Sequence, residues 1–488
     1  MSDAPDRARL LDAMAAIGMA DPGDPKTFLM PKAAKRILDP SVVVVLGARG
    51  SGKSSLAAFL TEHHMDPAKA RANALAHGMQ FSFCFDAFSQ RSTRHTDANI
   101  LDPFVRGVDD ETLRDFWLGW LVFQLNAELH HLSGDAVWSS SDLTPLYDTI
   151  TKMRQNPSAM GRMSTVTRAK MVSNLDEAEQ GFATAAAKIG ADDVAVTAVY
   201  DDLDMVGAFE PSVRLRFIRA LLGLWTSFST RYRHIRAKIF LPADLFDLRL
   251  FDTLDVSKLM GRAERLEWDV PSLYRLVLRQ LGAQGDDVRG WLESFGVTFR
   301  EQGTNGWIPD EPSDEATKRW LTETLRSVVA VNGTRSTVQQ WIPNRLRDGR
   351  DRVAPRSMLG FFRESARLAQ GRAPRAHWNH LLAVDDAVSA LDVVGSRRVE
   401  EVREVYEWVD RLLALKGRAL PMARTDIEAL LEHDTLDAPK PTPPRDGRTV
   451  TTELIRMGML RELGTGERLD VPDLFVRHFG VLRRDATE

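Results

Sequence analysis

Cysteine is nearly absent from this sequence, since Cys84 is the one cysteine in 488 residues. A single thiol excludes an intrachain disulfide and a zinc site built from several cysteines, and it is typical of a reducing compartment. Long apolar runs are also missing, because the most apolar short stretch, Val42–Leu46, is far too short to cross a bilayer. The first 40 residues mix charges throughout, so no signal peptide is predicted. We expect a cytoplasmic protein that is not integral to a membrane.

A large excess of charge of one sign is missing too. The net charge is −4, with 43% hydrophobic and 27% charged residues. This balance excludes a globally basic nucleic-acid coat and a highly acidic tail, although it leaves room for a local basic patch. A chain of 488 residues exceeds a single hydrophobic core, so about two to four domains are expected.

The hydrophobic pattern predicts an α/β protein. Residues 1–40 are predicted to form a helical lead-in, and β-branched, strand-like runs alternate with helical patterns after it. Strands separated by helices favour a largely parallel sheet with helices on both faces. The clearest predicted strands are Ser41–Leu46, Phe81–Phe85, Val194–Tyr200 and Ala237–Leu241.

The pattern divides the rest of the chain into three regions. Residues 41–270 are predicted to form the sheet core, with a helical insertion at about 116–190 that begins with a buried helix over Phe116–Leu132 and becomes polar and exposed from about residue 150. Residues 271–416 are mainly helical. Residues 417–488 contain a proline-rich stretch and then the pattern helix, hairpin, helix, which is typical of a winged helix. The predicted elements of this end are Thr449–Met457, Met459–Leu463, Arg468–Val471 and Asp473–Phe479.

The strongest motif lies directly after the first predicted strand. Its letters fit the pattern G-x-x-x-x-G-K-[ST], and a helical run, Ser55–Leu60, follows it. Glycines let such a loop curl so that backbone N–H groups face phosphate oxygens, the lysine contacts the β- and γ-phosphates, and the hydroxyl ligates magnesium. The helix N-terminus adds its positive dipole end. We predict a P-loop that binds ATP and Mg²⁺ through Gly47, Ala48, Arg49, Gly50, Ser51, Gly52, Lys53, Ser54 and Ser55, with Ser54 as a metal ligand.

A P-loop usually works with an acidic strand end. The predicted strand Val194–Tyr200 is followed by Asp201-Asp202-Leu203-Asp204. We predict that Asp201 holds the magnesium shell, that Asp202 polarises the attacking water, and that Asp204 could serve either role. A solvated acidic loop or a helix cap is the alternative.

Three further positions are weaker candidates. Asp244 could sense the γ-phosphate, but a helix N-cap before Leu245 explains it equally well. Asp86 could face the same site, although a cap or turn is favoured. Pro355-Arg356 opens a predicted helix, Ser357–Ala369, where a cation opposes the helix dipole unless an anion faces it. Arg356 is therefore predicted to contact nucleotide phosphate, and the alternative is a surface ion pair with Asp348 or Asp351.

In this order, the P-loop, Asp-Asp-Leu-Asp, the strand near Asp244, Pro355-Arg356 and the winged-helix pattern resemble STAND- and KAP-type P-loop ATPases, which are related to AAA proteins. The resemblance covers about Phe28–Leu482. It implies a P-loop NTPase core, a helical lid and a winged helix, with magnesium- and water-handling acids at Asp201 and Asp202 and a lid arginine at Arg356. Relatives commonly carry an arginine at the end of the fourth strand. Here Pro242 stands near that place, so hydrolysis is expected to be slow or partner-stimulated.

The same resemblance implies an ATP-dependent molecular switch. Such proteins control self-association or a partner effector, and many act in bacterial antiphage defence. The sequence carries no effector signature of its own, so a separate effector chain is expected. The alternative is a DNA-binding, AAA-like loader that uses the winged helix. Arg445–Arg484 holds eight arginines against six acids, a small excess for duplex binding. Its candidate DNA contacts are Arg461, Arg468, Arg477, His478, Arg483 and Arg484.

Overall fold

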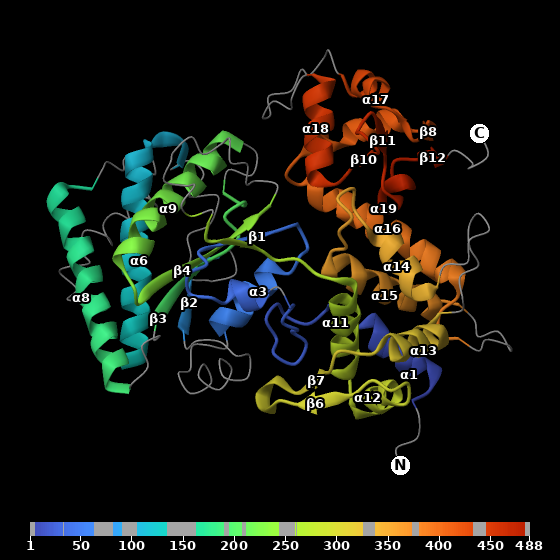
Figure 1. Ribbon diagram of the computed structural model, residues 1–488, viewed down its shortest axis with the longest axis horizontal. Helices are drawn as coiled ribbons and strands as arrows, with labels where there is room; N and C mark the ends of the chain where they lie inside the picture. The colour runs from blue at the N-terminus through green and yellow to red at the C-terminus, as the bar shows by residue number, and fades with distance from the viewer. Residues whose placement is uncertain are drawn as a thin grey trace. The chain divides into compact units, whose positions relative to one another are not determined.

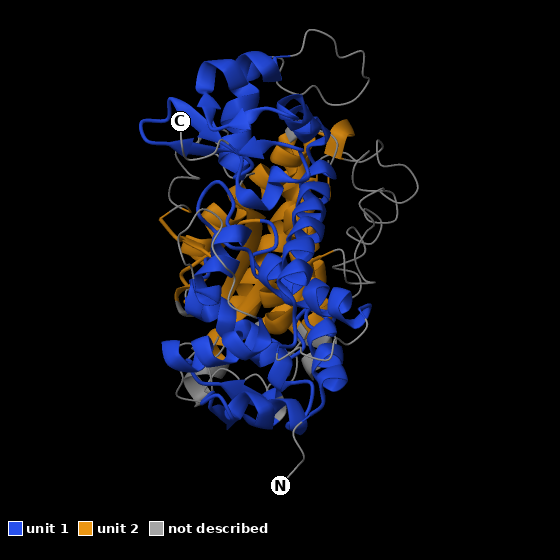
Figure 2. Ribbon diagram, turned by 90° about the vertical axis from the view of Figure 1, so that its right-hand side faces the viewer, with its two compact units in different colours: residues 1–32, 49–52, 267–488 blue, residues 33–48, 53–266 orange. Residues whose placement is uncertain are grey.

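The structure is a computed structural model, and it describes residues 5–32, 34–62, 82–89, 105–133, 163–189, 195–206, 211–243, 259, 261–325, 337–372, 380–432 and 446–483. The chain forms two compact units, coloured separately in Figure 2. Unit 1 contains residues 1–32, 49–52 and 267–488, and unit 2 contains residues 33–48 and 53–266. The predicted lead-in therefore groups largely with the C-terminal half of the chain.

Unit 2 is built on a five-stranded parallel sheet in the order β2-β3-β4-β1-β5. The α/β class expected from the sequence is confirmed. Every residue of β1 and β3 is buried, as expected for strands covered on both faces. The strands are β1 (Val44–Gly47), β2 (Ser82–Phe88), β3 (Ala195–Tyr200), β4 (Ile235–Pro242) and β5 (Ala263–Arg265).

Helices cover both faces of this sheet (Figure 1). The helix α3 (Lys53–Glu62) contacts β2, β3 and β4, whereas α6 (Asp110–Ser133) and α9 (Pro211–Arg231) pack together on the other side. A short helix, α2 (Ala34–Ile37), precedes β1. The buried helix predicted over Phe116–Leu132 is confirmed, because its tryptophans, Trp117 and Trp120, are at most 2% exposed.

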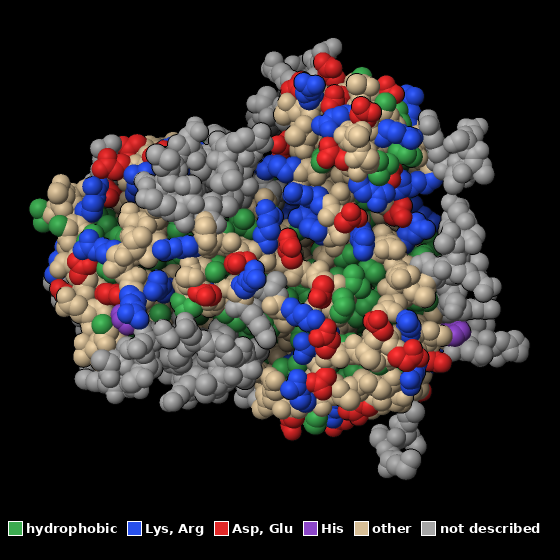
Figure 3. Space-filling view, in the orientation of Figure 1, with side chains coloured by type: hydrophobic (Ala, Val, Ile, Leu, Met, Phe, Trp, Pro, Cys, Tyr) green, Lys and Arg blue, Asp and Glu red, His purple; other side chains and the backbone are tan. Residues whose placement is uncertain are grey.

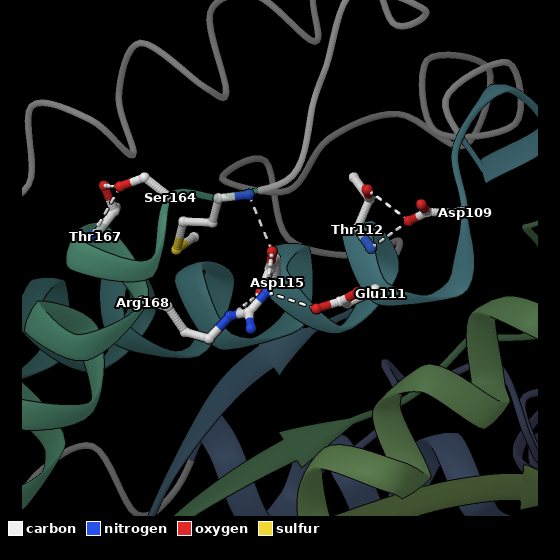
Figure 4. Close-up of polar contacts among 8 residues, drawn as sticks. Asp109, Glu111, Thr112, Asp115, Ser164, Thr167 and Arg168 are labelled. Carbon is white, nitrogen blue, oxygen red and sulfur yellow. Dashed lines mark hydrogen bonds and ion pairs between the residues drawn. The ribbon is translucent and has the colours of Figure 1, made fainter.

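The long helix α8 (Thr165–Ile189) is attached to α6 by charge (Figure 4). Arg168 donates from Nε to Asp115 over 2.7 Å and from Nη2 to Glu111 over 3.2 Å. Asp115 also accepts the backbone N–H of Met163. Most residues of α8 are partly or fully exposed where their burial is known, so the predicted exposed helix is confirmed for this part. The preceding residues 134–162 lie outside the described part of the chain.

Unit 1 is mainly helical. Its first helix, α1 (Arg7–Ala15), packs on α15 (Pro355–Gln370), and α15 packs most extensively on α16 (Val384–Arg403). A small hairpin, β6 (Phe299–Glu301) and β7 (Trp307–Pro309), interrupts the predicted helical region. Among the described residues before 417, the remaining helices are α11 (Val270–Gly282), α12 (Asp286–Glu293), α13 (Asp314–Thr324), α14 (Val338–Leu346) and the 3-10 segments Gly303–Asn305 and Glu407–Leu415.

A buried arginine joins three segments of unit 1 through hydrogen bonds. Arg279 of α11 is fully buried. Its guanidinium donates to the backbone oxygens of Pro25 over 2.6 Å and Phe28 over 3.3 Å, and also to those of Asn305 and Trp307. One buried side chain thus supplies donors to four backbone carbonyls.

The C-terminal end matches the predicted helix and hairpin. The helix α18 (Gly447–Met457) ends at Gly458, whose φ of 80° gives the left-handed cap that glycine favours. The strands β10 (Arg461–Leu463) and β11 (Arg468–Asp470) pair as a hairpin, and β9 (Met422–Ala423) adds to β11. The other elements here are β8 (Ala419–Leu420), α17 (Arg424–Leu431), α19 (Asp473–Val476) and β12 (Leu482–Arg483).

Candidate functional site

The predicted phosphate loop is a tight turn between β1 and α3. Gly47 ends the buried strand and Lys53 begins the helix. Gly50 and Gly52 have φ angles of 75° and 90°, a left-handed region that other residues enter at a cost. The turn therefore depends on glycine at two positions of the motif. The first turn of α3 presents backbone N–H groups that have no partner within the helix.

Lys53 folds back over this turn. Its Nζ donates to the carbonyl oxygens of Gly47 and Ala48, each at 3.0 Å. Ser51 is buried, and its carbonyl accepts the indole N–H of Trp268 over 2.8 Å. Ser54 and Ser55, the next two residues of α3, are half-buried. The ammonium group thus lies against the loop, with a hydroxyl on the same helical turn.

The phosphate loop follows the carboxyl end of β1, a strand in the interior of the sheet. The strand β1 has β4 on one side and β5 on the other, so the carboxyl end of β1 is a topological switch point. In open parallel sheets, ligands bind outside the carboxyl ends of the strands at such a point. The Gly47 carbonyl also accepts the backbone N–H of Ala243 over 3.0 Å, directly after Pro242. Proline thus ends β4, where the sequence placed it.

The predicted acids follow β3 as expected. Asp201 is 3% exposed, and its backbone N–H donates to the Phe88 carbonyl of β2 over 2.7 Å. Asp202 is half-buried with a φ of 55°, and Asp204 is half-buried in the turn after it. Left-handed backbone is uncommon outside glycine, asparagine and aspartate. The chain therefore bends sharply immediately after the buried carboxylate.

A small cavity of about 30 Å³ connects Asp201 with α3. Asp201 lines it together with Ala57 and Ala58, which belong to the helix that begins at Lys53. Asp86 of β2 lines the same cavity, and its carboxylate accepts the Ser89 hydroxyl over 2.6 Å. A polar space of this size can hold a water molecule or two. The residues that line it are Ala57, Ala58, Thr61, Asp86, Ser89, Val199 and Asp201.

The three predicted acids after β3 differ in whether they line this cavity. Asp201 lines it, and Asp202 and Asp204 are not among its lining residues. Asp86 lies within a strand, so the favoured interpretation as a cap or turn residue was wrong. Ser89 was not predicted at all. Simple alternation would place Asp86 and Ser89, three positions apart, on opposite faces. The register of β2 against β3 shifts between Asp86 and Phe88 and brings both residues to one cavity, a shift that the sequence pattern did not indicate.

Arg356 is engaged by an acid that sequence spacing did not suggest. Pro355 and Arg356 open α15 as predicted, and the Arg356 backbone N–H donates to the Gly50 carbonyl over 3.3 Å. The Arg356 side chain is 65% exposed and binds Glu401 of α16 over 2.8 Å. The alternative pairing with Asp348 or Asp351 is wrong, since Asp348 binds Arg352 and Asp351 lies near Arg347. Asp244 lies outside the described residues.

The arginines of the C-terminal end are largely paired within unit 1. Arg461 and Arg483 both bind Asp470, and Arg477 binds Asp392 of α16 over 2.7 Å. Arg468 donates to the Pro421 carbonyl. His478 contacts the Ser396 hydroxyl through Nδ1 over 3.1 Å. Arg484 lies outside the described residues. These guanidinium groups are engaged in holding the module to α16 and to itself.

Comparisons with known proteins assign this chain to no family. A scan against models of protein families finds none that matches the chain, and a search of curated proteins finds no match. Within the described ranges, no three histidine, cysteine or acidic side chains are grouped so that they could hold a metal ion. None of the helices described here has the length and apolar character to cross a membrane.

Proposed function

We propose that this chain binds ATP with Mg²⁺ through the loop Gly47–Ser55 and hydrolyses the nucleotide. The observation that carries the proposal is the position of the loop. It joins the carboxyl end of the strand at the switch point to a helix N-terminus, and Lys53 Nζ lies 3.0 Å from two of its carbonyls. Triphosphate oxygens would replace these carbonyls as partners of the ammonium group, and the N–H groups of the turn and of α3 would face the phosphates.

The acids at the end of β3 supply the metal and water chemistry in this proposal. Ser54 on the first turn of α3 would ligate Mg²⁺, and Asp201 would hold its water shell from the strand end. The cavity supports a position of Asp201 beside α3, the helix that carries Ser54, through Ala57, Ala58 and Thr61. Asp202 would orient the attacking water, with Asp204 nearby. When bound, the metal neutralises charge on the phosphates as the bond to the γ-phosphoryl group breaks.

The resemblance to STAND- and KAP-type ATPases supports a role as a switch. In this proposal, residues 271–416 act as a helical lid that carries Arg356. The C-terminal elements act as a winged helix, since β9, α17, α18, β10 and β11 follow one another in the order strand, two helices and hairpin. Nucleotide state would control self-association or a separate effector, as in bacterial antiphage defence.

The loader alternative needs the winged helix on DNA. Its observed ion pairs weaken that alternative, because Arg461, Arg477 and Arg483 are already bound to acids. These three arginines are matched by three acids, Asp470, Asp392 and Asp473, so they carry little uncompensated charge for DNA phosphates. Turnover stimulated by duplex DNA and lost at high salt would favour the loader.

The decisive experiment is nucleotide titration by calorimetry with Mg²⁺ and a non-hydrolysable ATP analogue. Lys53→Ala should weaken binding by about 10- to 100-fold, because a charged hydrogen-bonding partner is worth about 1.5–3 kcal/mol. Lys32→Ala is the matched control, since this lysine is 53% exposed and binds Glu311. Equal affinities of Lys53→Ala and the control would overturn the site.

A second variant distinguishes nucleotide hydrolysis from nucleotide binding. Asp202→Asn should retain nucleotide affinity and lose most phosphate release, because asparagine tolerates the left-handed backbone but lacks the charge. Unchanged turnover in this variant would remove Asp202 from the mechanism.

A further inference from the structure

The helices α15 and α16 meet along a cluster of arginines that outnumber their acidic partners. We call this cluster the arginine seam. It consists of Arg356, Arg363, Arg367, Arg397 and Arg398, which surround the two carboxylates of Glu364 and Glu401.

Two of these arginines are mostly buried and neutralise the two acids. Arg363 is 17% exposed and binds Glu364 over 3.0 Å. Arg398 is 11% exposed and binds Glu401 over 2.9 Å. The acids themselves are shielded, with Glu364 at 9% and Glu401 at 23% exposure. These four side chains form a neutral base for the seam.

The other three arginines share the same two carboxylates from the solvent side. Arg397 approaches Glu364 to 2.6 Å and Arg367 approaches it to 3.6 Å, while Arg356 binds Glu401 over 2.8 Å. Their exposures are 48%, 46% and 65%. Since each acid is already matched by a buried arginine, the exposed three carry positive charge that no carboxylate of the seam balances.

The pKa values of the two glutamates agree with this excess. Burial acts to raise the pKa of Glu401, but the charges of Arg356 and Arg398 outweigh it, and the pKa is lowered. Burial likewise opposes ionisation of Glu364, and its hydrogen bonds from Arg397 and Arg363 lower the pKa in the same way. Both acids are therefore ionised at neutral pH. The five arginines still exceed these two negative charges, so the seam carries a net positive charge.

The surroundings do not cancel the excess. Residues 345–372 hold eight arginines and three acids, in a chain with 64 basic and 68 acidic residues. Of the other acids of α16, Asp392 binds Arg477 and Glu400 binds Arg403. Asp385 and Asp386 share Arg372, so one negative charge is left over there. Arg403 also binds Asp410, so this adjoining cluster offsets part of the charge. Figure 3 shows lysine and arginine side chains gathered on the face of unit 1 around α14 and α16.

We propose that the arginine seam is a binding site for the phosphate backbone of nucleic acid. Guanidinium groups match phosphate oxygens in a bidentate fork and are less strongly hydrated than ammonium groups. Arg356 and Arg367 are eleven positions apart on one helix, which corresponds to about 16 Å. A row of that length suits successive phosphates of a strand better than one small anion. The proposal concerns a different surface from the winged-helix module. Arg356 is shared with the proposed nucleotide lid, so the test variants change only Arg367 and Arg397, which have no role in the proposed nucleotide site.

The test is fluorescence anisotropy with a labelled 30-base-pair duplex and the full-length protein over a range of NaCl concentrations. Three phosphate contacts predict a slope of about −2.7 for log K against log salt, or roughly 40-fold weaker binding at 200 mM than at 50 mM. The double variant Arg367→Gln/Arg397→Gln should reduce the slope by about 2 and weaken binding at least tenfold at 50 mM, uniformly across sequences.

Two controls keep the result interpretable. Arg319→Gln removes an arginine that is 61% exposed and paired with Glu315 on α13, and it should bind as the unmodified protein does. Arg367→Lys/Arg397→Lys preserves the charge and should keep most of the salt slope. Because all these side chains are about half exposed or more, thermal melts should show folded protein.

Three results would overturn the proposal. The first is no binding of duplex or single strand at 50 mM NaCl. The second is equal binding by the double glutamine variant and Arg319→Gln. The third is a competing poly-glutamate that binds the seam more tightly than nucleic acid, which would make the partner an acidic protein.

Discussion

Asp86 of β2 and Asp201, the residue directly after β3, line one cavity beside α3. Their surroundings differ, because Asp86 accepts the Ser89 hydroxyl whereas Asp201 is almost completely buried at the strand end. Both carboxylates are therefore candidate partners for a cation in this space.

Asp201→Asn should lower Mg²⁺-dependent ATP hydrolysis at least tenfold, because it removes the charge predicted to hold the metal shell. Asp86→Asn should have a smaller effect on the Mg²⁺ concentration needed for half-maximal turnover. Steady-state phosphate release over a Mg²⁺ series checks both. If Asp86→Asn shifts the Mg²⁺ requirement more than Asp201→Asn does, the metal assignment must move to β2.

Arg356→Ala should reduce hydrolysis by about tenfold or more and change ATP affinity less, because the proposed lid arginine would act on charge that develops in the transition state. Turnover and calorimetric affinity are measured on the same preparation. Arg319→Ala, an exposed arginine on α13, is the control. Equal losses of affinity and turnover in Arg356→Ala would indicate a ground-state phosphate contact in place of a lid role.

The stability of the protein should increase between about pH 7 and pH 10. Lys238 of β4 is 4% exposed, and its Nζ donates to the carbonyls of Asp39 and Val42, each at 2.5 Å. Burial lowers the pKa of Lys238 to about 7. Between that value and the ordinary pKa of lysine, the unfolded chain binds more protons than the folded one, so the free energy of unfolding increases with pH.

Urea denaturation at pH 7.0, 8.5 and 9.5 measures this dependence, and Lys238→Met should flatten it. The burial of Tyr200, Tyr232 and Tyr274 raises their pKa values above 10, so tyrosines act only above the tested range. A pH dependence that Lys238→Met leaves unchanged would mean that another group is responsible.

Arg279→Met should destabilise the folded state by about 3 kcal/mol or more. The guanidinium donates to four backbone carbonyls, those of Pro25, Phe28, Asn305 and Trp307, and a hydrogen bond that involves a charged group contributes about 1.5–3 kcal/mol. Differential scanning calorimetry should show a lower Tm. Arg289→Met, a change at a guanidinium that lies 4.1 Å from the Trp307 ring centroid, is the control for general loss of an arginine. Equal Tm values for the two variants would contradict the structural role of Arg279.

Local patterns predicted much of this fold. Runs of β-branched or aromatic residues located β1 to β4, and the motif around Lys53 located the turn and the start of α3. The glycines and short runs after residue 449 located α18 and the hairpin. These features are local, so a short window of sequence contains the physical cause of each one.

Features that depend on distant partners could not be predicted. The strand β5 is only Ala263–Arg265 and is partly exposed, so it has no hydrophobic pattern, and pairing with β1 alone defines it. Likewise, no spacing rule indicates that α1 packs on α15 or that Arg356 binds Glu401, which is 45 residues away. Asp86 was named, but its place in a strand depended on its pairing with β3.

The left-handed backbone at residue 202 restricts the residue types that fit this position. Glycine, asparagine and aspartate adopt this conformation readily, while other residues lose about 1–2 kcal/mol. Of the three, aspartate alone brings a negative charge. Glutamate, the other acid, would meet that backbone penalty, so descendants that keep both this bend and an anion at the strand end should retain aspartate.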